Sequence, residues 1–289
     1  MKKNVVLIVN PVSGAIDKTE FIDAATLFAT KENLNVVLYT TSGKEDISKI
    51  RTLYAQHKPE RVIIVGGDGT IKIVAEALET QDVILGILPA GSANGLSVDL
   101  NLPTTLEENL EVAFLSHYVE IDMISINGIK SIHLSDIGIN ADLVKNYEES
   151  DLRGFWGYAL QAYTTLKDAE EPFLASITAN NETVKHTARM IVIANSQRYG
   201  TGVTINPNGR MDDGKFELIV LKSLDLFLLG KIITGNMPID SDDIVIISTE
   251  KAFIKTNRPV NLQVDGEYCG AQNELEIHIL HKQMKIAVP

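Results

Sequence analysis

The chain has 289 residues, 45% of them hydrophobic and 22% charged, which are the proportions of an ordinary soluble protein. Its 38 acidic and 26 basic side chains give a formal net charge of −12, which argues against nucleic acid as the main partner. No apolar run reaches the roughly 18 residues of a membrane span. The single cysteine, Cys269, cannot form an internal disulfide and favours a reducing, cytoplasmic compartment.

Residues 4–115 alternate short β-branched segments with amphipathic ones, a pattern typical of an α/β domain with a largely parallel sheet. Strands are expected at residues 5–9, 34–39, 61–65 and 83–88. Helical spacing of apolar side chains predicts helices at residues 21–28, 47–54, 71–78 and 105–115.

After about residue 118 the pattern changes to short alternating segments separated by turn signals, which indicates an antiparallel sandwich or a curled sheet. Its clearest strands are residues 191–194, 216–221, 244–248, 260–264 and 275–280. Helices are expected at residues 155–167 and 223–234.

Three predicted strands of the first half run directly into turns of small residues. The turns contain Asn10 to Gly14, Gly66 to Thr70, and Gly91 to Gly95. In an open α/β sheet the carboxyl ends of the strands form the ligand-binding edge. Glycine lets a ligand approach the backbone, and a following helix offers unpaired N–H groups to an anion. We therefore expect a phosphate there, with Thr70 either capping its helix or binding a phosphate oxygen.

Several common alternatives are disfavoured because their motifs are missing from the chain: a P-loop, a dinucleotide-binding G-x-G-x-x-G after a strand, a G-x-S-x-G elbow and H-E-x-x-H. The second half offers two acidic turns, Asp212-Asp213-Gly214 and Asp265-Gly266-Glu267. Each is a hairpin signal on its own. Each could also hold a hydroxyl group or a cation.

Taken together, these motifs resemble the diacylglycerol kinase catalytic-domain family, which includes bacterial lipid kinases and the sphingosine and ceramide kinases and is distantly related to NAD kinase. The resemblance spans essentially the whole chain and is carried by Asn10-Pro11, Ser13-Gly14, Thr40-Thr41, Gly66-Gly67-Asp68-Gly69-Thr70, Gly91-Ser92-Ala93-Asn94, Asp213-Gly214 and Asp265-Gly266-Glu267. It implies an α/β domain that binds ATP in residues 1–121 and an antiparallel β-sandwich that accepts a lipid in residues 122–280. A final segment, residues 281–289, would return to the first domain.

The resemblance also implies roles for single residues. The nucleotide would contact Asn10, Ser13, Gly14, Thr40, Gly66, Gly67, Asp68, Gly69, Thr70, Gly91, Ser92 and Asn94, with Glu267 in the same binding set. Asp265 would be the base that takes the proton from the lipid hydroxyl, and Asp68 would assist it or hold Mg²⁺. Asp213, with the backbone carbonyls of Arg210 and Lys215, resembles a structural cation site. Arg153 is a candidate basic helper.

The chain departs from the family pattern after the Thr70 turn, where Lys72 and Ile73 replace the usual asparagine and glutamate. The Ser92-x-Asn94 form is nearer to the sphingosine and ceramide kinases. The sequence thus predicts an ATP- and Mg²⁺-dependent kinase acting on a hydroxyl of a diacylglycerol- or sphingoid-like lipid. The alternatives are a nucleotide-binding regulator without catalytic activity and a kinase of a soluble hydroxyl compound such as NAD.

A lipid substrate implies peripheral contact with a membrane surface. The apolar segment at residues 226–233 is one candidate for that contact. A buried core or a homodimer interface is the commoner use of such a helix.

Overall fold

The structure is a computed structural model that describes residues 2–79, 81–92, 94–138, 141, 171–199, 203–223 and 242–289. Arg153 and the helices expected at residues 155–167 and beyond residue 223 lie outside these ranges. The chain divides into two compact units, each described by itself: Met1–Asp122 with His281–Pro289, and Met123–Tyr199 with Val203–Leu280.

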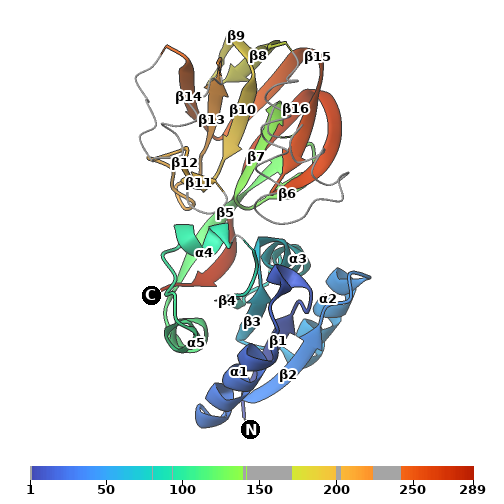
Figure 1. The fold of residues 1–289 in the computed structure, drawn as a ribbon, viewed down its shortest axis with the longest axis vertical. Coiled ribbons are helices and arrows are strands. Elements are labelled where there is room, and N and C mark those ends of the chain that lie inside the picture. Colours follow the sequence, from blue (N-terminus) through green and yellow to red (C-terminus); the bar gives the residue numbers. More distant parts are fainter. Residues whose placement is uncertain are drawn as a thin grey trace. The chain divides into compact units, whose positions relative to one another are not determined.

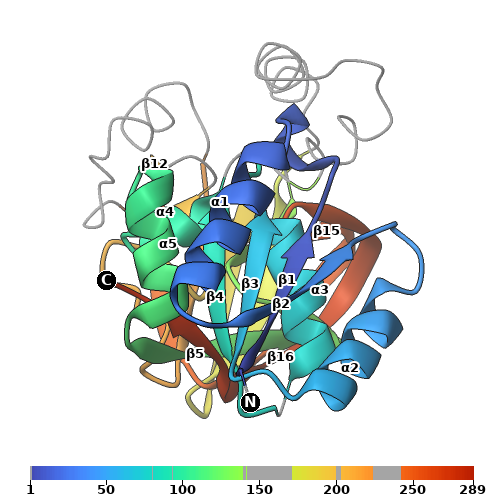
Figure 2. The ribbon, with the colours of Figure 1, turned by 90° about the horizontal axis from the view of Figure 1, so that it is seen from below.

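The first unit is built on a parallel sheet, whose strands run in the order β16, β4, β3, β1, β2 (Figures 1 and 2). The strands are β1 (Asn4–Val9), β2 (Asn35–Thr40), β3 (Arg61–Gly66), β4 (Ile84–Pro89) and the end of β16 (Glu267–Ala287). The helices are η1 (Ser13–Ala15), α1 (Thr19–Lys31), α2 (Asp46–His57), α3 (Asp68–Leu78), α4 (Gly95–Asp99) and α5 (Leu106–Leu115). The α/β class expected for this half is confirmed.

Both faces of this sheet are covered because its central strands β1 and β3 are apolar and buried after their first residues. Val5, Leu7 and Val9 pack into one core cluster with residues of α1 and α5, and the rings of Phe28 and Phe114 lie 5.1 Å apart there. Side chains alternate between the faces of a strand, so the intervening buried residues of β1 lie on the face of α2 and α3. Figure 2 shows α1 and α5 on one side of the strands and α2 and α3 on the other.

The second unit consists of antiparallel strands. They are β6 (Ile129–Ser131), β7 (Leu134–Gly138), β8 (Phe173–Ala179), β9 (Glu182–Ala188), β10 (Met190–Ala194), β11 (Arg198–Tyr199), β12 (Val203–Thr204), β13 (Phe216–Leu221), β14 (Ile244–Thr249), β15 (Lys251–Val264) and most of β16, with β5 (Tyr118–Ile126) beside β16. One row runs β14, β13, β10, β7, β15, and another runs β9, β8, β15, β16. The expected antiparallel sandwich is confirmed.

Strand β15 belongs to both rows of the sandwich. Residues 252–256 pair with β8, whereas residues 262–264 pair with β7. Between these stretches the register with β16 shifts, at the position of Pro259, which has no N–H to donate. A bulge of this kind bends a strand and lets it pass from one sheet to another. The inner faces meet in a core that includes Phe173 and Phe216.

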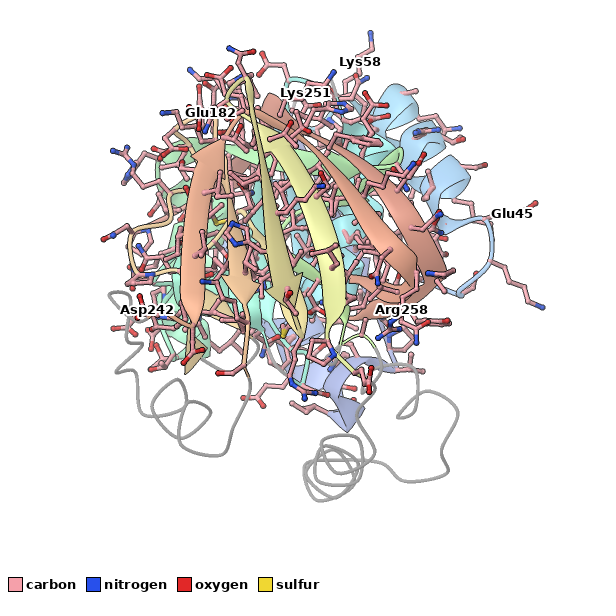
Figure 3. The ribbon with its side chains drawn as sticks, turned by 90° about the horizontal axis from the view of Figure 1, so that it is seen from above. Glu45, Lys58, Glu182, Asp242, Lys251 and Arg258 are labelled. Atoms are coloured by element: carbon pink, nitrogen blue, oxygen red, sulfur yellow. The ribbon has the colours of Figure 1, made fainter. Side chains whose placement is uncertain are left out.

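Figure 3 shows the sandwich strands with Glu182 at the start of β9, Lys251 at the start of β15 and Arg258 in the middle of β15. Among the described residues, no helix combines the length and the apolar character needed to cross a membrane.

Candidate active site

Three strands of the first unit end side by side, and each continues into one of the small-residue turns. We name these the first turn (residues 10–14, after β1), the second turn (residues 66–70, from β3 into α3) and the third turn (residues 90–95, from β4 into α4). Backbone hydrogen bonds join them at their bases: the Asn10 amide donates to Val65 O at 3.0 Å, and the Ala90 amide donates to Gly66 O at 2.9 Å. The structure therefore brings these predicted turns together at the carboxyl edge of the sheet.

Glycine is required where the turns touch. A Cβ on Gly67 would lie 2.9 Å from the Cα of Gly91, and a Cβ on Gly91 would meet the Cα of Gly67. A Cβ on Gly14, which has a φ of +63°, would lie 2.8 Å from Ala90 O. These contacts are backbone against backbone, so the neighbours cannot move aside cheaply. Gly69 differs, because a Cβ there would meet nothing within 4 Å.

Thr70 does not cap its helix, one of the two roles predicted from the sequence, and its contact with a phosphate oxygen stays a prediction. Its side chain is 2% exposed, and its hydroxyl accepts a hydrogen bond from Asn10 Nδ2 at 3.0 Å. Gly67 occupies the N-cap position of α3, with no side-chain cap. A Cβ on Gly66 would collide with the Thr70 side chain. The hydrogen bond between Asn10 and Thr70 thus links the first turn to the second through the buried side chain of Thr70.

The Asp68 carboxylate is engaged with backbone amides. Its Oδ2 accepts from the Gly95 amide at 2.8 Å, and its Oδ1 accepts from the Leu96 amide at 3.1 Å. These are the first amides of α4, which have no carbonyl partner within the helix. Asp68 therefore joins the second turn to the third.

Asn94 closes the third turn on itself. It has a φ of +52°, its side-chain oxygen accepts from the Gly91 amide at 2.8 Å, and its Nδ2 donates to Gly91 O at 3.0 Å. Ser92 is exposed in the same turn. Of these two predicted contact residues, Asn94 shapes the turn and Ser92 presents its hydroxyl to solvent.

Thr40 ends β2 beside the first turn and is exposed, and the loop that follows it is held by a buried carboxylate. Asp46 accepts hydrogen bonds from Tyr39 Oη at 2.5 Å, the Ser42 amide at 3.0 Å and the Gly43 amide at 2.7 Å. Burial raises the pKa of Asp46, but these hydrogen bonds lower it by more, so its pKa lies below the ordinary value. Burial, followed by the bond to Asp46, raises the pKa of Tyr39 to about 12.

Lys18 is a residue of this site that the sequence did not indicate. It lies just before α1 and is 4% exposed. Its Nζ donates to Ser13 O at 2.6 Å and to Ala90 O at 2.8 Å, linking the first turn to the third. Ser13 Oγ also donates to Ala90 O, at 2.9 Å. A lysine in a loop is usually solvated, so only the tertiary structure reveals its burial.

In the second unit, Asp265 and Gly266 form the two-residue turn of the β15–β16 hairpin, with φ values of 49° and 86°. Positive φ at both positions is the requirement of a type I′ turn, for which Asp-Gly is a favoured pair. The Asp265 carboxylate accepts from Ser131 Oγ at 2.8 Å, the Ile132 amide at 3.0 Å and the His133 amide at 3.0 Å. It therefore fixes the β6–β7 connection, while Glu267 is exposed.

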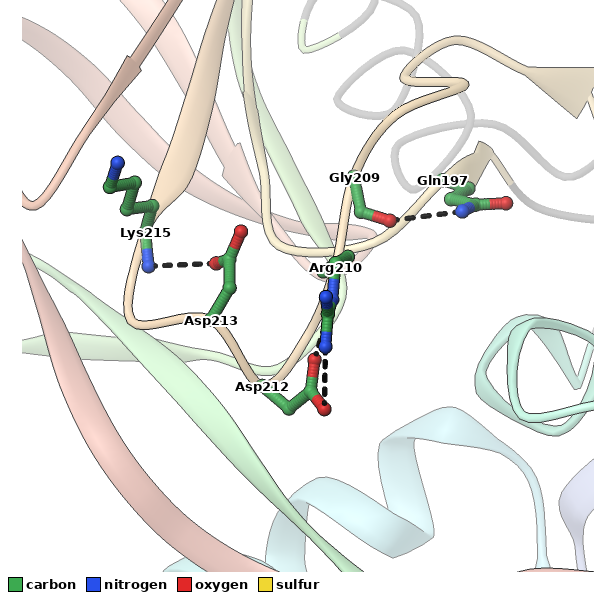
Figure 4. Close-up of polar contacts among 6 residues, drawn as sticks. All are labelled: Gln197, Gly209, Arg210, Asp212, Asp213 and Lys215. Carbon is green, nitrogen blue, oxygen red and sulfur yellow. Dashed lines mark hydrogen bonds and ion pairs between the residues drawn. The ribbon is translucent and has the colours of Figure 1, made fainter.

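The predicted cation loop has its carboxylates directed to neighbours within the loop (Figure 4). Asp213 Oδ1 accepts from the Lys215 amide at 3.0 Å, and Asp212 pairs with the Arg210 guanidinium at 3.1 Å. The described residues contain no group of three or more His, Cys, Asp or Glu side chains that could hold a metal ion. The predicted site uses one carboxylate and two carbonyls, so a cation there stays a prediction.

The three turns fit a nucleotide phosphate chain, since they combine glycine-lined backbone, the exposed hydroxyl of Ser92 and the buried cation of Lys18. Asp68 carries the one carboxylate among the residues of the three turns, and both of its oxygens already accept hydrogen bonds from backbone amides. A magnesium ion would therefore take most of its ligands from phosphate oxygens and water, as Mg²⁺ commonly does in nucleotide sites. Lys72, which replaces a family asparagine, is buried on α3.

An α/β unit with three interlocked strand-end turns, followed by an antiparallel sandwich, defines the class of kinases related to NAD kinase and diacylglycerol kinase. Residues 4–126 match the diacylglycerol kinase catalytic domain, and residues 136–287, more than half of the chain, match the YegS C-terminal NAD kinase beta sandwich-like domain. The chain belongs to this family of diacylglycerol kinase-like enzymes.

Curated relatives and solved structures resemble the chain over most of its length. The chain is 28% identical to an uncharacterized protein of Synechocystis sp., over 98% of this chain and 70% of that protein. It is 26% identical to the probable lipid kinase YegS of Escherichia fergusonii, over 96% and 94% of the two chains. A crystal structure of a diacylglycerol kinase from Bacillus anthracis shares the fold with a TM-score of 0.73 at 18% identity, covering 99% and 97%. A second crystal structure from that organism has a TM-score of 0.80 at 21% identity and covers the same shares of the two chains.

Proposed function

We propose that this protein transfers the γ-phosphoryl group of ATP, with Mg²⁺, to a hydroxyl of a diacylglycerol- or sphingoid-like lipid. The observation that carries the proposal is the set of three strand-end turns, held in contact at Gly67 and Gly91 and built around a buried lysine. The lipid substrate is suggested by the name of the relative, a probable lipid kinase, which matches over 96% of this chain.

In this proposal the first unit binds the nucleotide. The phosphates would lie against Gly69, at the exposed start of α3, and against the hydroxyls of Ser13 and Ser92. Thr40 would contact the nucleotide from the end of β2. Mg²⁺, when bound, would neutralise phosphate charge during transfer. Asp68 would hold the third turn in position and contribute a carboxylate oxygen to that ion.

The second unit would supply the base. The family resemblance assigned this role to Asp265, whose carboxylate is held in place by three donors. A general base must reach the substrate hydroxyl, and Glu267 is the exposed carboxylate of the same hairpin. We therefore assign the positioning of the turn to Asp265 and propose Glu267 as the base, with Asp265 as the alternative. Asp213, Arg210 and Lys215 remain the proposed site of a structural cation.

The test is ATP consumption with Mg²⁺ against a panel of diacylglycerol, monoacylglycerol, sphingosine, ceramide and NAD in mixed micelles. The proposal predicts turnover on at least one lipid and none on NAD. Turnover on NAD alone would replace it with the soluble-substrate alternative. ATP binding without turnover on any compound would favour the regulator, whose motivation is the replacement of the usual asparagine and glutamate by Lys72 and Ile73.

A further inference from the structure

Among the residues that the structure describes, no carboxylate oxygen pairs with the buried ammonium of Lys18. Its two hydrogen-bond acceptors are the neutral carbonyl oxygens of Ser13 and Ala90. The acidic neighbour in sequence is Asp17, whose Oδ1 already accepts from the Thr19 amide at 3.0 Å and from the Thr19 hydroxyl at 2.8 Å. No ion pair involves Lys18 within the described ranges.

A charge in this position is costly for the protein alone. A lysine that is 4% exposed is usually paired with a carboxylate, because removing an ammonium from water costs several kcal/mol. Burial accordingly lowers the pKa of Lys18, and the nearby charge of Asp17 raises it by less. Two carbonyls offset part of this cost, but they use only two of the three ammonium protons, and no described residue accepts the third. An anionic ligand would supply both the missing charge and the missing acceptor.

The location of Lys18 indicates which anion. Its two acceptors belong to the first and third turns, and Ala90 O is also within 2.8 Å of where a Gly14 Cβ would lie. The same turns contact the second turn at Gly67 and Gly91. Lys18 therefore joins the first and third turns at the carboxyl edge of the sheet, which is the part of an α/β sheet suited to phosphate.

We propose that Lys18 is the charge-supplying residue of the nucleotide site: its ammonium holds the first turn to the third, and the phosphate chain of the nucleotide neutralises it. This inference rests on the proposed function, because it takes the ligand of the turns to be ATP. It goes further in assigning the charge at the site to a residue outside the glycine-rich motifs.

A purely structural tie makes a different prediction. If Lys18 only held the two turns together, its loss would disturb the site as a whole. The affinities for nucleosides and nucleotides would then fall by the same factor. If its charge acts on phosphate, the loss of affinity grows with the number of phosphate groups. Adenosine, ADP, ATP and inorganic tripolyphosphate therefore form the series of probes that separates the two roles.

The experiment compares dissociation constants of the wild type, Lys18→Met and Lys31→Met for these four probes, by calorimetry without a lipid substrate. Methionine is unbranched and of similar length, and replacing a buried charge by an apolar side chain is often tolerated. Lys31→Met is the matched control, since it removes the same charge from the exposed end of α1. Should Lys18→Met fail to fold, Lys18→Gln, which keeps donors but not the charge, takes its place.

We expect ATP to bind about 10- to 100-fold more weakly to Lys18→Met, as for the loss of one charged hydrogen bond. The affinity for ADP should fall less, the affinity for adenosine should stay within about twofold of the wild type, and binding of tripolyphosphate should be lost. Lys31→Met should bind all four probes as the wild type does. Equal weakening of all probes, or no weakening of ATP, would overturn the inference and leave the proposed function standing. A wild type that binds neither ATP nor tripolyphosphate would overturn both.

Discussion

At the scale of single residues, two carboxylates that the family motif assigns to chemistry have backbone partners. Asp68 accepts the first two amides of α4, and Asp265 accepts two amides and a hydroxyl near β7. Each carboxylate therefore stabilises the conformation of a neighbouring loop, in addition to any role in catalysis. Loss of activity on mutating either residue would not by itself identify a base, because the surrounding turn would change with it.

The division of roles between Asp265 and Glu267 can be measured. Glu267→Gln should lower kcat by about 10²- to 10⁴-fold, as for loss of a general base, and leave the free energy of unfolding within about 0.5 kcal/mol of the wild type. Asp265→Asn should lower both, with a stability cost of about 1–3 kcal/mol from donors left unpaired. Lipid turnover and urea denaturation give the two readouts. Wild-type turnover in Glu267→Gln would return the base to Asp265.

Asp46 should make stability depend on pH. Its folded pKa is lowered, so its contribution to stability is present above the unfolded pKa of about 3.9 and is lost as the pH falls through the folded value. Asp46→Asn should therefore cost about 1–3 kcal/mol at neutral pH and much less near pH 3. Urea denaturation at both pH values measures this, with the exposed Asp23→Asn as control. An equal cost at both pH values would contradict the assigned hydrogen bonds.

At the scale of elements, the three turns act as one structure because glycines let their backbones touch. A side chain at Gly67 or Gly91 would separate the second turn from the third, and α4 would lose the carboxylate that caps it. The sequence predicted which residues lie at these strand ends, because glycine after a buried strand is a strong signal. It could not show that Thr70 faces Asn10, since that contact joins residues 60 positions apart.

Substitutions at the glycines of the second and third turns should separate effects on folding from effects on ligand contact. Gly67→Ala and Gly91→Ala should each lower the free energy of unfolding by about 1–3 kcal/mol, as for overpacked sites, and weaken ATP binding with it. Gly69→Ala should leave stability unchanged or slightly higher, because alanine favours a helix.

If phosphate lies against Gly69, its alanine variant should still bind ATP more weakly, since a methyl group would occupy that space. Thermal unfolding and nucleotide calorimetry on the three variants measure both effects. Stable Gly67→Ala and Gly91→Ala proteins with wild-type affinity would contradict the packing described for the turns.

At the scale of the whole molecule, periodicity predicted the elements of the first unit closely, because buried parallel strands and amphipathic helices leave clear patterns. It missed much of the second unit. Strand β9, with the sequence ETVKHTA, has mostly polar side chains, so its alternation is weak. The positive φ values of Asn180 and Asn181, at the β8–β9 turn, show that an Asn-Asn pair was the signal that could have located this hairpin.

The lengths of the last two strands were also underestimated. The predicted segments 260–264 and 275–280 are parts of β15, with 14 residues, and β16, with 21 residues. Local patterns stop at bulges and at changes of partner, as at Pro259. At its end, β16 pairs with β4 through Lys285 and Ile286. Pairing between segments about 200 residues apart is a tertiary property that a single sequence does not display.

The central claim is that this chain moves a phosphoryl group from ATP to a lipid hydroxyl. The most direct measurement is transfer of label from γ-labelled ATP into lipid extracted after incubation with Mg²⁺ and the lipid panel, using wild type and Glu267→Gln side by side. With the wild type, label should appear in a lipid phosphate monoester, and with the variant this label should fall by about 10²-fold or more. Label confined to the aqueous phase, with ATP bound, would contradict the central claim.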